Sequence, residues 1–460
     1  MRTHAATILA LSALTSGAAV SACGDGASNM RASAEEGEAS GISASASASA
    51  TDGATGTDGA TDSASASASA TQGSASATMG SASAATEADS GNSNSAGEGP
   101  KFDLGAQPDV DLHCGTGKGG GGGGTDFSYI WIANSNESTV SKINTETLVE
   151  EGRYITRPDS NGNPSRTSVN LNGDMAIGNR NGGVTMIYAL HDNCPDASNT
   201  SSGAGDVKPW PDGCVGWHTP MAYASQRLVA WTAGMYNNQT CRYEDTKVWT
   251  SGANDPLIDV VLLDGETGTV EQTVPLPGNV VASYYGIYGG AVDSNDNFWG
   301  SQLSQGHIVR VDRLTFVPQT WAMAVPGYGM AVDRNDRVWT CSSQVGRFDY
   351  PSQSWQTAQA GGSGGCMPDG ANLLWLANNP MVAVDIDTLA VMQTLPVPSY
   401  VHGVSIDFNG YVWGPAINNN EAYRVDPATG IVDVVTGLNL PYTYSDMTGF
   451  GLSQAVGPSG

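Results

Sequence analysis

Residues 288–299 read YGGAVDSNDNFW, and the same arrangement returns at 328–339 (YGMAVDRNDRVW) and at 402–413 (HGVSIDFNGYVW). In each copy an Asp stands six residues before a Trp, and a short strand-like segment that ends in Asp follows the Trp. Four degenerate copies complete a set of seven, around Trp131, Ile177, Trp249 and Trp375. Self-similarity of this kind indicates a fold that is built from repeated units.

The spacing of the repeat predicts the unit. Trp299, Trp339, Trp375 and Trp413 follow one another by 40, 36 and 38 residues, which is enough for four short antiparallel strands. Polar and apolar residues alternate in many segments, and no window shows a sustained helical period. The sequence therefore predicts an all-β fold, a seven-bladed β-propeller over residues 126–460.

The two ends of this region predict how the ring closes. Residues 444–449 align with the first strand of the repeat, but no Trp strand follows them. Residues 128–134 align with the Trp strand, but no first strand precedes them. We predict that one blade is split between the two ends of the domain, which would pair edges that otherwise stay open.

The repeated Asp has two interpretations. Asp and Asn residues commonly cap tight turns through their side-chain oxygens, and this role suits the hairpin between the first two strands of a blade. The segment from Asp293 to Asp296 also offers oxygen atoms at alternate positions, as calcium loops do, although it lacks their Gly and distal Glu. We favour hairpin capping and predict no metal site, with Mg²⁺ or Ca²⁺ as the alternative.

The N-terminal part of the chain carries targeting features. Residues 1–22 have a basic start at Arg2, an apolar stretch and a small-residue end, as secretory signal peptides do. The sequence Val20-Ser21-Ala22-Cys23 resembles a bacterial lipobox, in which the cysteine is acylated. We predict a lipidated Cys23, an extracytoplasmic location and, because Gly24 follows, retention at the outer membrane or cell surface.

Residues 23–125 are dominated by Ser, Ala, Gly and Thr and contain few residues that could fill a core. This composition predicts a disordered, acidic tether between Cys23 and the propeller. The whole chain has a formal net charge of −26, which argues against a nucleic-acid partner. The predicted membrane contact is through the lipid anchor only, and we expect a monomer.

Six cysteines remain after Cys23, an even number that favours disulfides in an exported protein. Cys194 and Cys214 flank a polar insertion, and Cys341 and Cys366 lie in neighbouring repeats. We predict that each of these pairs forms a bridge. Cys114 and Cys241 are left for the third bridge.

Candidate ligand-binding residues stand five positions before the repeated Asp, where the blades together form a ring around the axis. This position holds Tyr288, Tyr328 and His402, Tyr444 through the split blade, and Ser165 in the second repeat. His218 and Trp217 fall in the third repeat, whose alignment stays open. Such a ring could stack on a cyclic or apolar ligand and hydrogen-bond its edges. The alternative is that these rings only plug the central channel.

The phrases around Asp293, Asp333 and Asp407 resemble the repeats of seven-bladed propellers related to virginiamycin B lyase and, more loosely, to NHL-repeat proteins. This resemblance implies an active-site His at the start of an inner strand, which His402 matches, with a nearby Glu, a second His and Mg²⁺. The family's Glu three residues after the Trp is missing, because those positions hold Asn134, Gln302, Ser342, Asn378 and Ala416.

We therefore predict a binding module for a small molecule, a peptide or a surface protein. The alternative is a metal-assisted lyase or hydrolase at the end of the channel, with His402 as the candidate catalytic residue.

Overall fold

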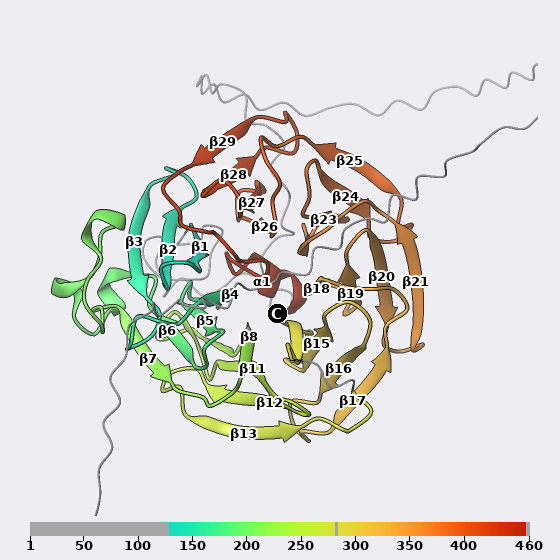
Figure 1. The fold of residues 1–460 in the computed structure, drawn as a ribbon, viewed down its shortest axis with the longest axis horizontal. Helices are drawn as coiled ribbons and strands as arrows, with labels where there is room; N and C mark the ends of the chain where they lie inside the picture. Colours follow the sequence, from blue (N-terminus) through green and yellow to red (C-terminus); the bar gives the residue numbers. More distant parts are fainter. Residues whose placement is uncertain (1–127, 281–283, 457–460) are drawn as a thin grey trace, which may run out of the picture. The chain divides into compact units, whose positions relative to one another are not determined.

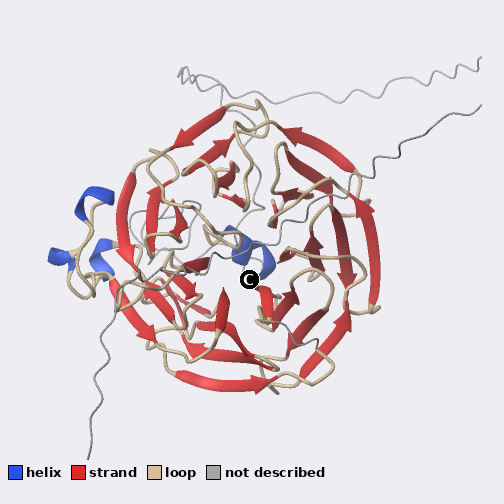
Figure 2. Ribbon diagram, viewed as in Figure 1, coloured by secondary structure: helices blue, strands red, loops and turns tan. Residues whose placement is uncertain are grey.

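The computed structural model describes residues 128–280 and 284–456, which belong to one compact unit of the chain. These residues form seven antiparallel sheets around a central axis, plus one two-stranded hairpin (Figure 1). Strands dominate the described part of the chain (Figure 2). The all-β, seven-bladed propeller predicted from the repeat is confirmed. The predicted boundaries at residues 22 and 125 lie outside the described residues.

The blades follow one another along the chain. Blade 1 contains β1 (Tyr129–Asn134), β2 (Thr139–Asn144) and β3 (Glu150–Ile155). Blade 2 contains β4 (Pro164–Val169), β5 (Met175–Asn179), β6 (Val184–Ile187) and β7 (Val215–Thr219). Blade 3 contains β8 (Ser225–Trp231), β11 (Lys247–Asn254), β12 (Leu257–Asp264) and β13 (Val270–Pro275). Blade 4 contains β14 (Ile287–Val292), β15 (Phe298–Gln302), β16 (His307–Val311) and β17 (Pro318–Ala322). Blade 5 contains β18 (Gly329–Val332), β19 (Val338–Cys341), β20 (Gln344–Asp349) and β21 (Ser354–Gln359). Blade 6 contains β22 (Cys366–Pro368), β23 (Leu373–Leu376), β24 (Met381–Asp385) and β25 (Val391–Leu395). Blade 7 contains β26 (Ser405–Ile406), β27 (Val412–Ala416), β28 (Glu421–Val425) and β29 (Val432–Val435).

The repeated Asp holds the hairpin between the first two strands of its blade. In Asp333 one carboxylate oxygen accepts hydrogen bonds from the backbone N–H groups two and four residues ahead, at 2.9 and 3.1 Å. The other oxygen accepts from the indole Nε1 of Trp339 at 2.9 Å. Asp293, Asp369 and Asp407 make the same contacts with their own tryptophans. The carboxylate therefore satisfies the buried indole, which explains the constant spacing of six residues and confirms hairpin capping.

The split blade is also confirmed. The backbone N–H of Trp131 in β1 donates to the carbonyl of Met447 at 2.9 Å, and the N–H of Tyr442 donates to the carbonyl of Ala133 at 3.0 Å. The C-terminal segment thus occupies the innermost position of the three-stranded blade. Gly449 stands where other blades have the Asp, and the indole Nε1 of Trp131 accordingly has no acceptor among the described residues.

One helix was not expected from the alternation pattern. α1 (Phe450–Val456) lies at the centre of the ring in Figure 1 and contacts the inner strands β14, β18, β22 and β26. The carboxylate of Asp446 accepts hydrogen bonds from the N–H groups of Gly449 and Leu452, which starts the helix. Seven residues are too few to produce a periodic signal. Of the helices in the described part of the chain, none is long and apolar enough to cross a membrane.

The structure aligns the second and third blades, which sequence alone left uncertain. Trp249 pairs with Ala230 as Trp339 pairs with Ala331, so β8 is the first strand of blade 3. The corresponding pairing in blade 2 joins Ser168 to Ala176, one residue before the expected Ile177. The placement of Trp217 and His218 in the third repeat was wrong, since both lie on β7, the last strand of blade 2. The insertion before β7 hides the period there.

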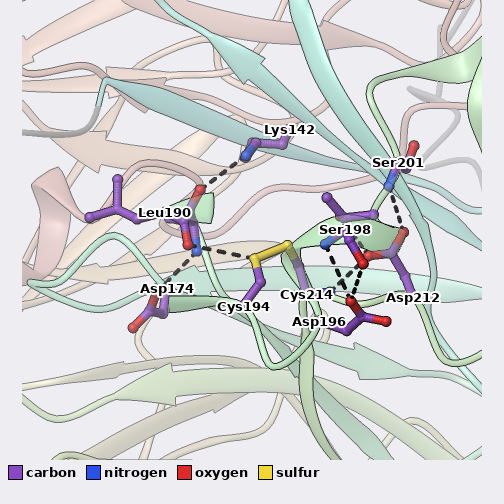
Figure 3. Close-up of a disulfide and its surroundings, with 11 residues drawn as sticks. Lys142, Asp174, Leu190, Cys194, Asp196, Ser198, Ser201, Asp212 and Cys214 are labelled. Carbon is purple, nitrogen blue, oxygen red and sulfur yellow. Dashed lines mark hydrogen bonds between the residues drawn. A yellow bond between two sulfur atoms is a disulfide. The ribbon is translucent and has the colours of Figure 1, made fainter. Parts of the chain in front are cut away.

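Two predicted disulfides are confirmed. Cys194 and Cys214 close the insertion between β6 and β7, which carries the short 3-10 helices η1 (His191–Asn193), η2 (Ala197–Asn199) and η3 (Ala204–Asp206). Polar contacts support this loop, because the carboxylate of Asp212 accepts from the N–H of Ser201 at 2.8 Å (Figure 3). Cys341 and Cys366 join blade 5 to blade 6. Cys114 of the third predicted bridge lies outside the described residues.

A hairpin of β9 (Met235–Asn237) and β10 (Arg242–Glu244) follows the first strand of blade 3. It packs on blade 2 through a salt bridge between Arg242 and Asp174 at 3.1 Å. The hairpin lengthens the first connection of this blade, so the spacing between the inner strand and its Trp strand departs from the repeat.

Candidate ligand site on the propeller axis

The residues five positions before the repeated Asp meet at the start of the inner strands. Tyr288, Tyr328, His402 and Tyr444 were predicted from sequence, and five of their six ring pairs have centroids 4.8 to 5.6 Å apart. Four different blades supply them. We call these four side chains, with Tyr442, the axial cluster.

Hydrogen bonds join the polar ends of the axial cluster. The hydroxyl of Tyr288 is 3.0 Å from that of Tyr328 and 2.8 Å from that of Tyr442. The hydroxyl of Tyr328 also contacts Nε2 of His402 at 2.5 Å and bonds the hydroxyl of Tyr442. Nδ1 of His402 is 2.9 Å from the hydroxyl of Tyr400. Both imidazole nitrogens therefore face tyrosine hydroxyls.

Three arginines surround the cluster. The guanidinium of Arg166 lies 3.5 Å from the ring centroid of Tyr444 and 4.9 Å from that of Tyr288. Arg227 lies 5.2 Å from the centroid of Tyr288, and Arg180 lies 4.1 Å from that of Tyr442. Each arginine stacks on an aromatic face, where a cation is attracted by the ring quadrupole.

Sequence reasoning missed these arginines for local reasons. Arg227 occupies the ring position of blade 3, which became clear only from the pairing of β8. Arg166 follows the ring residue Ser165, and strict alternation would turn it away from the axis. The pairing of β4 with β5 shifts register between Pro164 and Arg166. Such an irregularity re-aims a side chain.

His218 does not join the axial cluster. It lies on β7, the outermost strand of blade 2, with its Nδ1 2.9 Å from the hydroxyl of Thr185 and its ring beside Trp210. Trp217 lies on the same strand. Both residues were assigned to the third repeat from sequence, and the structure places them at the rim of the second blade.

The axial cluster itself is neutral at neutral pH, and the arginines around it are positively charged. Burial, followed by the charges of Arg166 and Arg180, lowers the pKa of His402 to about 3, so its imidazole is neutral. Burial raises the pKa of Tyr288 to about 12 and the pKa of Tyr328 well above its ordinary value. The hydroxyls are therefore protonated, and the guanidinium groups carry the charge.

The neutral His402 predicts a specific dependence of stability on pH. In the unfolded chain a histidine has a pKa of about 6.5. Between that value and about 3 the folded protein binds fewer protons than the unfolded chain, so the free energy of unfolding falls as the pH is lowered. We expect His402→Gln to lose less stability than the unmodified protein between pH 7 and pH 4.

Urea unfolding at the two pH values measures this difference, and His191→Gln, at an exposed histidine of the insertion, is the control. If the free energy of unfolding falls equally in all three proteins between pH 7 and pH 4, the fold does not hold His402 neutral.

The residues at the axis do not fit the Mg²⁺ that the lyase resemblance implies. The axial cluster offers one imidazole, whose nitrogens both contact tyrosine hydroxyls, and the three guanidinium groups around it repel a cation. Within residues 128–280 and 284–456 no group of three His, Cys, Asp or Glu side chains is arranged to hold a metal ion.

Comparison with known proteins places the chain by its fold. No protein-family model and no curated protein matches the sequence. Among solved structures, a functionally unknown protein from Desulfotomaculum acetoxidans DSM 771 has a TM-score of 0.50 at 9% identity, over 69% of this chain and 98% of that chain. A streptogramin B lyase has a TM-score of 0.43 at 13% identity, over 60% of this chain and 83% of that chain. Virginiamycin B lyase from Staphylococcus aureus has a TM-score of 0.41 at 13% identity, over 60% and 84%.

The seven sheets around one axis make the chain a seven-bladed β-propeller. The lyase structures named by the sequence resemblance are among its structural matches. At these identities the similarity concerns the fold and says nothing about activity.

Proposed function

We propose that this propeller is a binding module that takes a small ligand at the axial cluster. The observation that carries the proposal is the convergence of Tyr288, Tyr328, Tyr442 and His402 at the inner-strand starts. These hydroxyls and the imidazole can donate and accept hydrogen bonds, and their rings offer aromatic faces to a cyclic or apolar body.

The alternative role, a plug that only fills the channel, suits the opposite end of the inner strands better. There α1 packs the buried side chains of Phe450, Leu452 and Ala455 against the strands. A structural plug gains stability from apolar burial of this kind, whereas buried polar groups stabilise only when they are fully satisfied. Most polar groups of the axial cluster bond one another, but the hydroxyl of Tyr444 has no partner among the described residues, and this favours ligand binding over a plug.

A lyase reaction at this site is the second candidate, favoured by the position of His402 at an inner-strand start. Proton abstraction needs a base whose pKa lies near the working pH. Burial and the neighbouring arginines lower the pKa of His402 to about 3, which makes it a weak base. Its hydrogen bonds to two tyrosines and the missing Glu after the Trp strand also disfavour this reading.

We also propose that the module works outside the cytoplasm on a lipid anchor at Cys23. The two disulfides of the described residues suit an oxidising compartment. The predicted signal peptide and lipobox supply the rest of the argument, and they lie outside the described residues.

A thermal-shift screen with cyclic peptides and glycans, followed by calorimetry, tests binding at the cluster. We expect Tyr328→Phe to weaken binding of a hit about tenfold, because it removes a hydroxyl that would bond the ligand. Tyr423→Phe is a matched control, since this buried tyrosine of β28 bonds Glu421 away from the axis. Equal affinity of both variants for every hit would place the site elsewhere.

A further inference from the structure

Acidic side chains of the described residues do not balance the charges at the axis. Arg166 is 1% exposed and Arg227 is 8% exposed. Among residues 128–280 and 284–456 neither side chain forms an ion pair, and Nε and Nη2 of Arg166 and Nε of Arg227 have no hydrogen-bond acceptor. A buried cation without a counter-charge or an acceptor is strongly disfavoured.

Other buried arginines of this fold each have at least one hydrogen-bond acceptor, although Nε of Arg310 and Nε of Arg347 have none among the described residues. Arg153 pairs with Glu137 at 3.0 Å and with Glu150 at 2.7 Å. Arg347 donates to the carbonyl of Asp387 at 3.0 Å and to Gln356 at 2.6 Å. Each of these guanidinium groups thus has at least one carboxylate, carbonyl or amide acceptor, whereas the described residues supply none to Arg166 or Arg227. We take this difference as the sign of a partner for the axial pair.

The stacking contacts involve the flat faces of the two guanidinium groups. The guanidinium groups of Arg166 and Arg227 lie 4.9 and 5.2 Å from the ring centroid of Tyr288, so both charges border the same ring. An aromatic face contacts the plane of a guanidinium, whereas the N–H groups point outward from its edge. The unsatisfied Nε and Nη2 atoms of Arg166 form one such edge.

Resting on the proposed binding function, we infer that the ligand of the axial cluster carries an oxyanion group, a carboxylate or a phosphate, which Arg166 and Arg227 bind. The fork of N–H groups on a guanidinium matches the paired oxygens of these anions. The hydroxyls of Tyr288 and Tyr328 add neutral donors. Arg180 adds a third positive charge, with its Nη1 held by Asn163 at 2.7 Å.

Charge pattern supports the choice of an anion. The whole chain is strongly acidic, with a formal net charge of −26, yet no carboxylate pairs with the three axial arginines within the described residues. Three guanidinium groups without a paired carboxylate among the described residues create a positive potential, which attracts an anion to the axis.

The test is calorimetry and thermal shift of the full chain at constant ionic strength with inorganic phosphate, benzoate and the uncharged benzamide. We expect both anions to raise the melting temperature with increasing concentration, and benzamide to raise it much less. Arg166→Gln and Arg227→Gln should each weaken anion binding at least tenfold. Arg347→Gln, at a buried arginine with its own acceptors, should bind as the unmodified protein does.

A second readout guards against misfolding of the variants. Because removing an uncompensated buried charge relieves its cost, Arg166→Gln should melt no lower than the unmodified protein when no anion is added. Lower melting together with unchanged anion binding would overturn the inference and show that these arginines are structural. Stronger stabilisation by phosphate than by benzoate would identify a phosphate ligand, and the reverse a carboxylate.

Failure of this inference and failure of the proposed function give different results. If an uncharged ligand from the screen binds and loses affinity in Tyr328→Phe but not in Arg166→Gln, the anion is wrong and the binding site stands. If no ligand of either class responds to any axial variant, both are wrong.

Discussion

A protein that lacks residues 440–460 should be insoluble or largely unfolded. The deletion removes the innermost segment of blade 1, including the hydrogen bonds from Trp131 to Met447 and from Tyr442 to Ala133. It also removes α1 and the aromatic rings of Tyr442 and Tyr444. Each buried donor or acceptor left unpaired costs about 1 to 3 kcal/mol. Several such losses approach the total stability of a domain, about 5 to 15 kcal/mol.

Circular dichroism and thermal melting of the truncated protein measure this effect. Deletion of residues 457–460 alone is the control, because it leaves every contact named above in place. A protein without residues 440–460 that melts cooperatively near the temperature of the full chain would refute closure through the split blade.

The second large effect concerns the anchor. If Cys23 is acylated, Cys23→Ser should move the protein from the membrane fraction to the fraction released by washing, because the tether offers no other apolar anchor. The shift should be nearly complete rather than graded, since one residue carries all the acyl chains.

Fractionation of cells that express either form measures the distribution, with Ser28→Ala as a control substitution in the predicted tether. A Cys23→Ser protein that still sediments with membranes would contradict the lipid anchor.

The fold could be predicted from sequence because hydrogen bonding between the repeated Asp and its Trp fixes the spacing within each repeat. The carboxylate of Asp333 must reach both its own hairpin and the indole of Trp339, which fixes the spacing that reveals the blade. Where the repeated Asp or its Trp is replaced, the repeat is harder to recognise in the sequence. Blade 2 has Asn170 and Ala176 at these positions, and the repeat there was read one residue late.

The candidate site could be predicted only in part. Tyr288, Tyr328 and His402 belong to intact repeats, so their convergence followed from alignment. Arg166 needed the register shift in β4, and Arg227 needed the pairing of β8, neither of which a period of about 40 residues reveals. That no carboxylate among the described residues pairs with Arg166 or Arg227 is a property of three-dimensional contacts, which an alignment of repeats does not reveal.

The most direct test of the central claim is anomalous diffraction from crystals of the protein soaked in selenate, an analogue of phosphate and sulfate. If the axial cluster is an oxyanion site, the selenium peak should lie within hydrogen-bonding reach of Arg166 and Arg227. A soaked crystal with selenium peaks on the outer surface and none at the axis would contradict it.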